Sequence, residues 1–287
     1  MEDSEKVEDK MVWTDWERVA ELDFKETIPE RKYRKRGGGV FMLSFNRPER
    51  MNPMTDQGWE EICLAMGYAT KAEDIGIVIF AGMGDHFGIG GDIQWEKAGG
   101  LQKPWKVPPF DDYIRSSTKP TIAAVKGYCI GGHNHMAYHC DFTIAADNAI
   151  FGQFGPKIGS PIHGELVSSL AHIVGVKRAK EMWMLCRQYT AQQMLEWGLI
   201  NRVVPLSRLE EEVDQWCDEL LDVIPECVAL VKQSFEGVDM GLKGESGRLL
   251  NMIAPRFFQS PNVAEAISAF LQRRKPDFWG KAKSPKG

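Results

Sequence analysis

Two glycine pairs, each placed after an apolar run, are the part of this sequence best suited to chemistry. The pair Gly90–Gly91 follows the run at 75–82, and the pair Gly131–Gly132 follows the run at 118–127. Glycine has no Cβ, so its backbone N–H can approach a ligand closely. Two N–H groups that converge from neighbouring strand ends would stabilise an oxyanion, with about 3 kcal/mol from each donor. Glycine pairs after strands also occur as plain turns, so both interpretations stay open at this point.

Three of the six histidines, His133, His135 and His139, follow the second glycine pair directly. An imidazole titrates near neutral pH, so it can relay a proton beside an oxyanion. A histidine in a buried helix can equally be a structural residue. We favour a functional role for His135 and a packing role for His139, while His133 fits either capping or lining of the site. His135 and His139 have the i, i+4 spacing of metal ligands, but zinc needs further ligands and no metal site is expected.

The elements around these residues predict an α/β protein. Four segments have the apolar pattern of strands: 37–48, 75–82 and 118–127 each predict one strand, and 141–153 predicts two short ones. A helix is expected after Thr55, whose hydroxyl can cap it, because apolar residues follow at helical spacing. Strands that alternate with helices indicate mostly parallel pairing. We divide the chain into an N-terminal extension with a disordered start (1–36), an α/β core (37–206) and a C-terminal helical region (207–287).

Composition argues against several classes of partner. The net charge is −5, whereas nucleic acids and anionic membranes favour basic surfaces, so neither is an expected partner. No apolar run reaches the ~20 residues that span a bilayer. The six cysteines form no CxxC pair, and the first ten residues are too charged for a secretory signal. These features predict a cytoplasmic protein.

Five motifs, in this order along the chain, resemble the crotonase (enoyl-CoA hydratase/isomerase) superfamily. They are "NRPERMN" (46–52), "FGIGGDI" (87–93), "KPTIAAVKGYCIGG" (119–132), "CDFTIAADNAIFGQ" (140–153) and "GLINRVVP" (198–205). Five motifs in family order make the resemblance specific, over roughly residues 37–280. Within the superfamily the chain is most similar to dihydroxynaphthoyl-CoA synthase and ketocyclohexane-carboxyl-CoA hydrolase.

The resemblance implies a fold, a substrate class and a set of binding residues. The fold is α/β, a crotonase-like spiral of ββα units with a C-terminal helical oligomerisation region that builds homotrimers, usually paired into hexamers as dimers of trimers. The substrate is an acyl-CoA thioester, and no separate cofactor is expected because coenzyme A is part of the substrate. The thioester oxygen would lie between the amides of Gly91 and Gly132, which stabilise an enolate. Coenzyme A contacts are expected near Arg50, Ile89 and Ile93.

The chain departs from the acid–base pattern of the hydratases and of the synthases that it resembles. The two glutamates of the hydratases correspond here to His135 and Gly155. The synthase pattern keeps Ser160, but its aspartate position is Ile162 and its late tyrosine position is Phe258. Ordinary enoyl-CoA hydration and naphthoate ring closure are therefore both disfavoured.

An alternative set of acid–base candidates follows: His135, Ser160, His163 and Glu165. The favoured hypothesis is hydrolytic carbon–carbon cleavage, or ring opening, of a cyclic β-oxoacyl-CoA. Glu165 or His163 would activate water, and His135 or Ser160 would relay a proton to Cα. One alternative is hydration of an alicyclic enoyl- or dienoyl-CoA. A second is a non-catalytic subunit that binds coenzyme A or acts as a scaffold.

Overall fold

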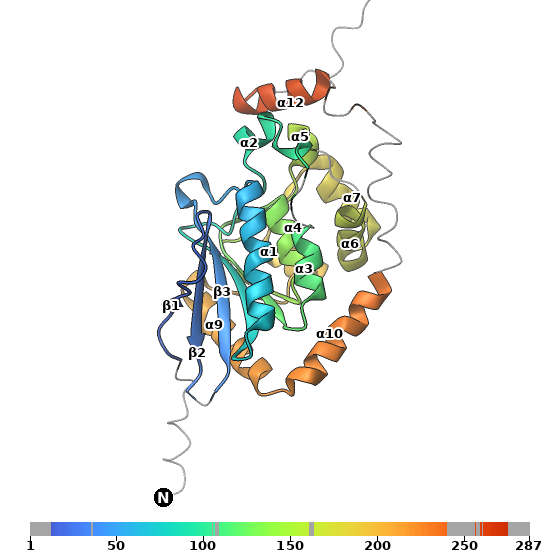
Figure 1. The fold of residues 1–287 in the computed structure, drawn as a ribbon. Coiled ribbons are helices and arrows are strands. Elements are labelled where there is room, and N and C mark those ends of the chain that lie inside the picture. Colours follow the sequence, from blue (N-terminus) through green and yellow to red (C-terminus); the bar gives the residue numbers. More distant parts are fainter. Residues whose placement is uncertain are drawn as a thin grey trace, which may run out of the picture.

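The structure is a computed structural model of the chain. It describes residues 13–35, 37–104, 106, 109–160, 164–239, 256, 259 and 261–274. Helices and strands alternate through the first two thirds of the chain, and helices alone follow in the described part after residue 204 (Figure 1). The predicted α/β organisation is confirmed.

A seven-stranded sheet forms the centre of the molecule, with strands in the order β1-β2-β3-β4-β5-β7-β10. Its strands are β1 (Glu17–Arg18), β2 (Thr27–Tyr33), β3 (Gly39–Phe45), β4 (Ile75–Gly82), β5 (Thr121–Val125), β7 (Phe142–Ala146) and β10 (Arg202–Val204). β1, β2 and β3 pair antiparallel, whereas the pairs from β3 to β10 are parallel. A smaller sheet joins β6 (Tyr128–Ile130), β8 (Ile150–Gly152) and β9 (Gln188–Thr190).

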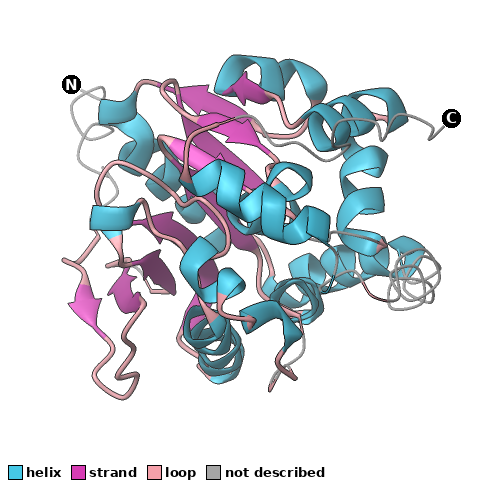
Figure 2. Ribbon diagram, turned by 90° about the horizontal axis from the view of Figure 1, so that it is seen from above, coloured by secondary structure: helices cyan, strands magenta, loops and turns pink. Residues whose placement is uncertain are grey.

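The helices pack around the central strands of these sheets (Figure 2). β1, at the edge of the larger sheet, is exposed. In chain order they are α1 (Asp56–Lys71), α2 (Ile93–Lys97), α3 (Phe110–Ser116), α4 (Gly132–His139), α5 (Gly155–Ile158), α6 (Glu165–Val174), α7 (Val176–Leu185), α8 (Ala191–Trp197), α9 (Leu209–Leu221), α10 (Pro225–Asp239) and α12 (Pro261–Leu271). Three short 3-10 helices are η1 (Pro48–Arg50), η2 (Gly100–Gln102) and η3 (Leu206–Arg208). The short helices α2 and α5 lie with α12 at one end of the molecule (Figure 1).

The central strands are apolar because both faces of the sheet are covered. β4 has the sequence IGIVIFAG, and its side chains contribute to two separate core clusters, one on each face. α1 packs on the first face, and α9 on the second. A parallel strand that is buried on both sides shows this kind of continuous apolar run.

Local signals place α1 as predicted. Thr55 adopts an extended conformation, and its side chain accepts a hydrogen bond from the backbone N–H of Gln57 at 3.2 Å. This bond satisfies one of the free amides that every helix start presents. The apolar residues that follow on α1 are buried against the sheet, among them Ile62, Cys63 and Met66.

The predicted boundary at residue 37 falls between β2 and β3. All seven residues of β2 pair with β3, so the segment before residue 37 contributes a full strand to the main sheet. Residues 1–12, where a disordered start was predicted, lie outside the described residues. In the described ranges, no helix combines the length and the apolar character needed to cross a membrane.

We expect Leu43→Ala to lower the free energy of unfolding by about 2 to 5 kcal/mol, because Leu43 is fully buried on β3 and its loss leaves a cavity. The measurement is urea denaturation of the purified protein. The matched control is Leu64→Ala on α1, where the side chain is 58% exposed, and the expected change is below about 0.5 kcal/mol. Equal effects for both variants would contradict the described core.

Candidate active site

A short backbone bridge brings the two glycine pairs together. Gly88 pairs in parallel with Cys129 of β6: its N–H donates to the Tyr128 carbonyl at 2.8 Å, and its carbonyl accepts from Ile130 at 2.9 Å. The chain then turns at Gly90 on one side and directly after Ile130 on the other. The bridge therefore fixes the register in which the two glycine turns meet.

The two turns are in direct contact. A Cβ placed on Gly90 would lie 3.0 Å from the amide nitrogen of Gly132 and 3.3 Å from Cα of Gly131. The backbone has φ +88° at Gly90 and +60° at Gly131, values that L side chains rarely adopt. Both positions therefore need glycine for conformation, and Gly90 also needs it for space.

The amides of Gly91 and Gly132 remain available for a ligand at this contact. The neighbouring N–H groups of Gly90, Gly131 and Asp92 all donate to other groups of the protein. Among the residues that the structure describes, no acceptor bonds to the N–H of Gly91 or of Gly132. Two free amides from adjacent turns are the arrangement that an oxyanion hole requires.

His133 holds the first turn in place. Its Nδ1 accepts a hydrogen bond from the Gly90 N–H at 2.9 Å, and its ring packs edge-on against Phe45, with centroids 4.3 Å apart. Burial, with a smaller effect from neighbouring His135, lowers the pKa of His133 to about 3. The imidazole is therefore neutral at pH 7, as an acceptor must be. A Cβ on Gly88 would lie 2.2 Å from this ring, which explains the third glycine of the loop.

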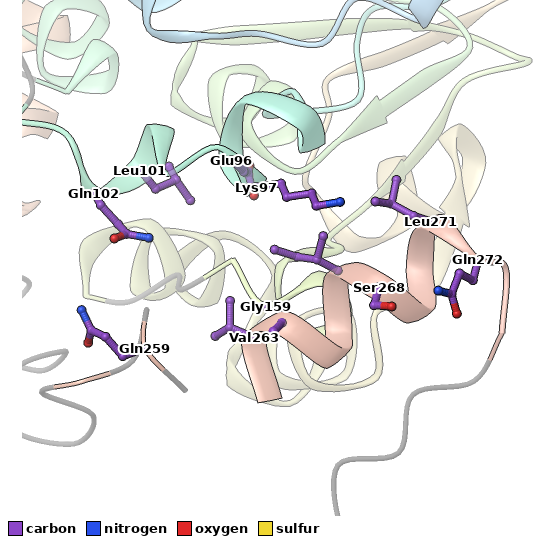
Figure 3. A pocket seen from close by; sticks show the side chains of 12 residues that line it. Glu96, Lys97, Leu101, Gln102, Gly159, Gln259, Val263, Ser268, Leu271 and Gln272 are labelled. Atoms are coloured by element: carbon purple, nitrogen blue, oxygen red, sulfur yellow. The ribbon is translucent and has the colours of Figure 1, made fainter. Parts of the chain in front are cut away.

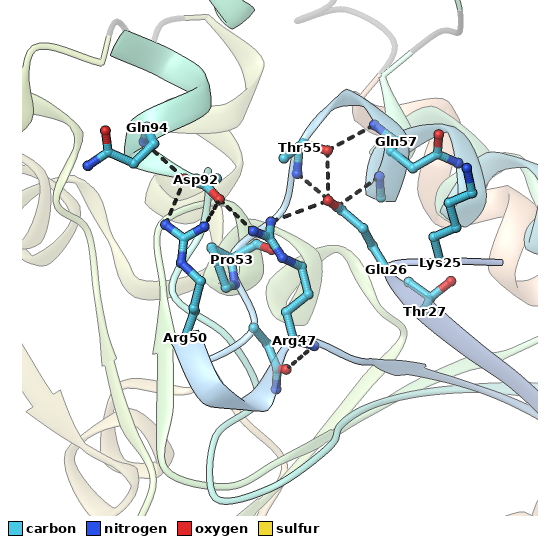
Figure 4. Close-up of polar contacts among 12 residues, drawn as sticks. Lys25, Glu26, Thr27, Arg47, Arg50, Pro53, Thr55, Gln57, Asp92 and Gln94 are labelled. Atoms are coloured by element: carbon cyan, nitrogen blue, oxygen red, sulfur yellow. Dashed lines mark hydrogen bonds and ion pairs between the residues drawn. The ribbon is translucent and has the colours of Figure 1, made fainter. Parts of the chain in front are cut away.

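Asp92 shapes the same loop through ion pairs. Its carboxylate caps α2 by accepting from the Gln94 N–H at 2.9 Å, and it also binds Arg47 at 2.8 Å and Arg50 at 2.7 Å (Figure 4). Burial alone would raise the pKa of Asp92, but the hydrogen bonds and the charges of both arginines lower it overall. Arg50, a predicted coenzyme A contact, thus contributes to the structure of the turn and keeps 42% of its side chain exposed.

Glu96 is a site residue that the sequence analysis missed. Its Oε1 lies 2.1 Å from the position that a Cβ on Gly91 would occupy, so the carboxyl packs directly on this glycine. Ser160, which follows α5, donates a hydrogen bond to it. Burial raises the pKa of Glu96 to about 7; the hydrogen bond from Ser160 lowers it, and the charge of Asp92 raises it. The helix cap at Asp92 could have indicated Glu96. Glu96 lies four residues after Asp92, and side chains four positions apart lie on the same face of a helix, here beside the glycine turn.

A cavity of about 510 Å³ opens beside Glu96, a size within the range of small-molecule sites. Its walls come from α2, η2, α5 and α12: Glu96, Lys97, Leu101, Gln102, Gly159, Gln259, Val263, Ala264, Ile267, Ser268, Leu271 and Gln272. Figure 3 shows α12 along one side of the cavity, opposite Glu96 and Lys97. The predicted coenzyme A contacts Ile89 and Ile93 flank the first glycine turn in the sequence, and both are partly buried.

Comparison with known proteins gives the family. The enoyl-CoA hydratase/isomerase family matches residues 35–281. The chain belongs to this family. Similar solved structures include an enoyl-CoA hydratase from Mycobacterium avium subsp. paratuberculosis K-10 (27% identity, 89% of this chain and 99% of that chain, TM-score 0.75). Another is an enoyl-CoA hydratase/isomerase from Pseudoalteromonas atlantica T6c (25% identity, 83% of this chain and 96% of that chain, TM-score 0.73). A third is a methylmalonyl-CoA decarboxylase (22% identity, 90% of this chain and 100% of that chain, TM-score 0.77).

These matches confirm the resemblance to the crotonase superfamily and its fold. The similarity to ring-forming synthases and ring-opening hydrolases of the family stays a prediction. The chain is therefore an enoyl-CoA hydratase/isomerase family member in which the positions expected to carry the hydratase glutamates hold His135 and Gly155. How the structure places His135 and the other proposed acid–base residues decides which of them can act on a substrate.

His135 lies in the protein interior. Its side chain is 2% exposed, and its ring centroid is 5.3 Å from that of Trp183 on α7. Burial, followed by the neighbouring His139, lowers the pKa of His135 to about 3, against a smaller raising effect of Gln153. The ring is neutral at pH 7. His139 donates from Nδ1 to the His135 carbonyl, at 2.8 Å, and stacks obliquely on Tyr138.

Glu165 begins α6 in an ion pair with Arg115 of α3, and both side chains are almost fully buried. Arg115 lines a separate small cavity together with the residues that end α4, among them Tyr138 and His139. The structure thus places Glu165 beside the end of α4 and brings Ser160, not Glu165, to the glycine turns. His163 lies outside the described residues.

Buried neutral histidines predict a pH dependence of stability. Between the ordinary pKa of 6.5 and the folded value of about 3, the unfolded chain binds a proton at His135 that the folded chain does not. Stability should therefore fall as the pH is lowered from 6.5, by up to about 1.4 kcal/mol per pH unit for this histidine.

The measurement is urea denaturation at pH 4 to 7 for wild type and His135→Gln. The variant should lose less stability per pH unit, so the two curves converge toward acid. Gln153→Leu, which keeps the imidazole, should retain the wild-type slope. Parallel curves for wild type and His135→Gln would show that His135 titrates with the same pKa in the folded and the unfolded protein, which would contradict the buried neutral imidazole.

Proposed function

We propose that this protein is an enzyme that binds an acyl-CoA thioester and stabilises its enolate between the amides of Gly91 and Gly132. The observation that supports it is the contact of two glycine turns that leaves these two N–H groups without an acceptor in the described structure. A thioester oxygen gains negative charge when an enolate forms, and fixed amides stabilise that charge without reorganising. Membership of the enoyl-CoA hydratase/isomerase family is consistent with this substrate class.

The reaction that we favour is hydrolytic ring opening of a cyclic β-oxoacyl-CoA. Water adds to the ring ketone, and the bond between the ketone carbon and Cα breaks with its electron pair moving to the thioester as the enolate. One proton of the water ends on Cα, and the ketone carbon becomes a carboxylic acid. Two features support the choice: neither hydratase glutamate position holds a carboxyl, and Leu101, Val263 and Ile267 give the cavity an apolar wall suited to an alicyclic ring.

Hydration of an alicyclic enoyl- or dienoyl-CoA is the second candidate. A solved structure that is 27% identical over most of both chains is an enoyl-CoA hydratase. The same pair of amides would hold the enolate that forms when water adds at Cβ. Both reactions add one water to the substrate, so they differ in whether the ring survives.

Incubation with a cyclic β-oxoacyl-CoA, such as a 2-oxocyclohexane-1-carbonyl thioester, should give an open-chain product. The reason is that the water oxygen becomes part of a new carboxyl group while the ring bond breaks. Mass spectrometry should show the gain of one water, and NMR of the product should show the ring carbons as a chain.

The matched substrate is the corresponding cyclic enoyl-CoA. Water addition to this thioester with the ring intact, and no reaction of the β-oxo thioester, would favour the hydratase instead. Binding of both thioesters without turnover of either would contradict both reactions and favour a non-catalytic role.

Removing one amide donor should lower turnover while the fold persists. Gly132→Pro deletes the N–H at the first position of α4, where proline is well tolerated. Loss of one donor from an oxyanion hole is expected to reduce kcat by roughly 100- to 1,000-fold. The control is Val176→Pro, which makes the same change at the first position of α7, on an exposed residue. Unchanged kcat in folded Gly132→Pro would contradict the role of this amide.

A further inference from the structure

We propose that Glu96 is the acid–base residue of this site, transferring the proton to and from Cα of the bound thioester, and that Ser160 positions its carboxyl group. The inference rests on the proposed function, because it takes the Gly91 and Gly132 amides as the place where the enolate is held. It assigns the proton transfer to a residue outside the set that the sequence suggested.

The position of Glu96 is the first reason. Its carboxyl oxygen packs on Gly91, in the space where any other residue would carry a Cβ. A thioester oxygen that accepts from the Gly91 N–H would lie at about 2.9 Å from that nitrogen, and the reacting Cα is only two bonds further. Carboxyl and Cα thus meet at the same glycine, and such closeness is the first requirement for an acid–base group.

The surroundings of Glu96 are the second reason. Asp92, the nearest other carboxylate, is held by Arg47 and Arg50, and Glu165 is held by Arg115. Glu96 has no ion pair among the described residues. The cavity walls contributed by η2 and α12 carry no charged side chain, so Lys97, the next residue on α2, is the other charged group of the described lining.

The protonation state of Glu96 fits both halves of a proton transfer. Burial raises its pKa to about 7, against the lowering effect of Ser160, so both forms are present near neutral pH. A base of this strength can accept a proton and return it, which is the optimum for general acid–base catalysis. The carboxyl is also neutral while the enolate exists, so two negative charges do not face each other in the hole.

Ser160 ties α5 to α2 through its hydrogen bond to Glu96. The hydroxyl donates to the carboxylate and can accept from the protonated acid, so one contact orients both forms. Because Ser160 acts through Glu96, its removal should change the pKa of the carboxyl as well as its orientation.

In ring opening, the Glu96 carboxylate takes a proton from the water whose oxygen bonds to the ketone carbon. The carbon–carbon bond then breaks toward the thioester, and the Glu96 acid gives its proton to Cα, which restores the carboxylate. With a saturated thioester the same group can remove the Cα proton and return a deuteron from D₂O. This exchange isolates the proposed step from ring opening and from water addition.

The experiment follows deuterium incorporation into cyclohexanecarbonyl-CoA, which has a single Cα proton, by mass spectrometry. The wild-type exchange rate should rise with pH and level off above about pH 7, because the carboxylate is the active form. Glu96→Gln should reduce the rate at least 100-fold, while calorimetry shows thioester affinity within about threefold of wild type. Glu96→Asp should restore part of the rate, and Glu73→Gln, on an exposed turn, should behave as wild type.

Two further variants test geometry. Gly91→Ala keeps the amide donor but places a methyl group where the Glu96 carboxyl now lies, so exchange should fall while thioester binding persists. Ser160→Ala removes a hydrogen bond that lowers the pKa of Glu96, so the midpoint of the pH–rate profile should move upward. An unchanged midpoint would contradict the positioning role of Ser160.

The outcomes separate this inference from the proposed function. If wild type exchanges the proton and Glu96→Gln does so equally well with the same pH profile, the assignment of Glu96 is wrong and the enolate site stands. If wild type binds the thioester without exchange, the assignment is also wrong. If wild type neither binds the thioester nor exchanges the proton, the proposed function fails together with the inference.

Discussion

The parallel bridge between Gly88 and β6 is the contact on which the arrangement of the site depends. Two backbone hydrogen bonds join the loop after β4 to β6, the strand that precedes α4, and each of these two segments then turns at a glycine. His133 reinforces the junction because its buried ring accepts from the Gly90 N–H. Most amides of the two turns are consumed by these contacts. In the described part of the chain, the register that builds the turns leaves the N–H groups of Gly91 and Gly132 without an acceptor.

The charged groups around this junction are arranged so that no unpaired negative charge opposes the N–H groups of the oxyanion hole. Asp92 lies on the loop itself, but Arg47 and Arg50 bind it and hold its carboxylate against the start of α2. The histidine ring beneath the turn is neutral, so it adds no charge of either sign. Glu96 is the exception, and burial keeps its carboxyl partly protonated. A carboxyl that can lose its charge is the only kind that can lie beside a forming enolate without opposing it.

The sequence predicted the elements whose signals are local. The apolar run of β4, the cap at Thr55 and the helix that starts at Gly132 all lie where the pattern placed them. The sequence analysis also expected the two glycine pairs to converge, but Gly131 directly follows β6, a strand of the smaller sheet, so their contact depends on the bridge between Gly88 and β6. The strand β2 was not predicted. Its sequence, TIPERKY, is largely polar, so its place in the sheet depends on pairing with β3 and not on an apolar pattern of its own.

The acid–base groups could not be found in this way, because their environment comes from distant parts of the chain. His135 occupies the position where a family glutamate was expected, but Trp183 on α7 covers it, and a local pattern does not reveal that burial. Glu96 lies on a helix of five residues, too short to show a period, and it is desolvated where α5 and α12 close over α2. The two amides therefore belong to residues of the family motifs, which a sequence reveals directly. The proton-transfer chemistry instead depends on which helices, distant in the sequence, pack over the oxyanion hole. A family can keep the first and change the second, which is the reason that the motifs of this chain identify its fold more closely than its reaction.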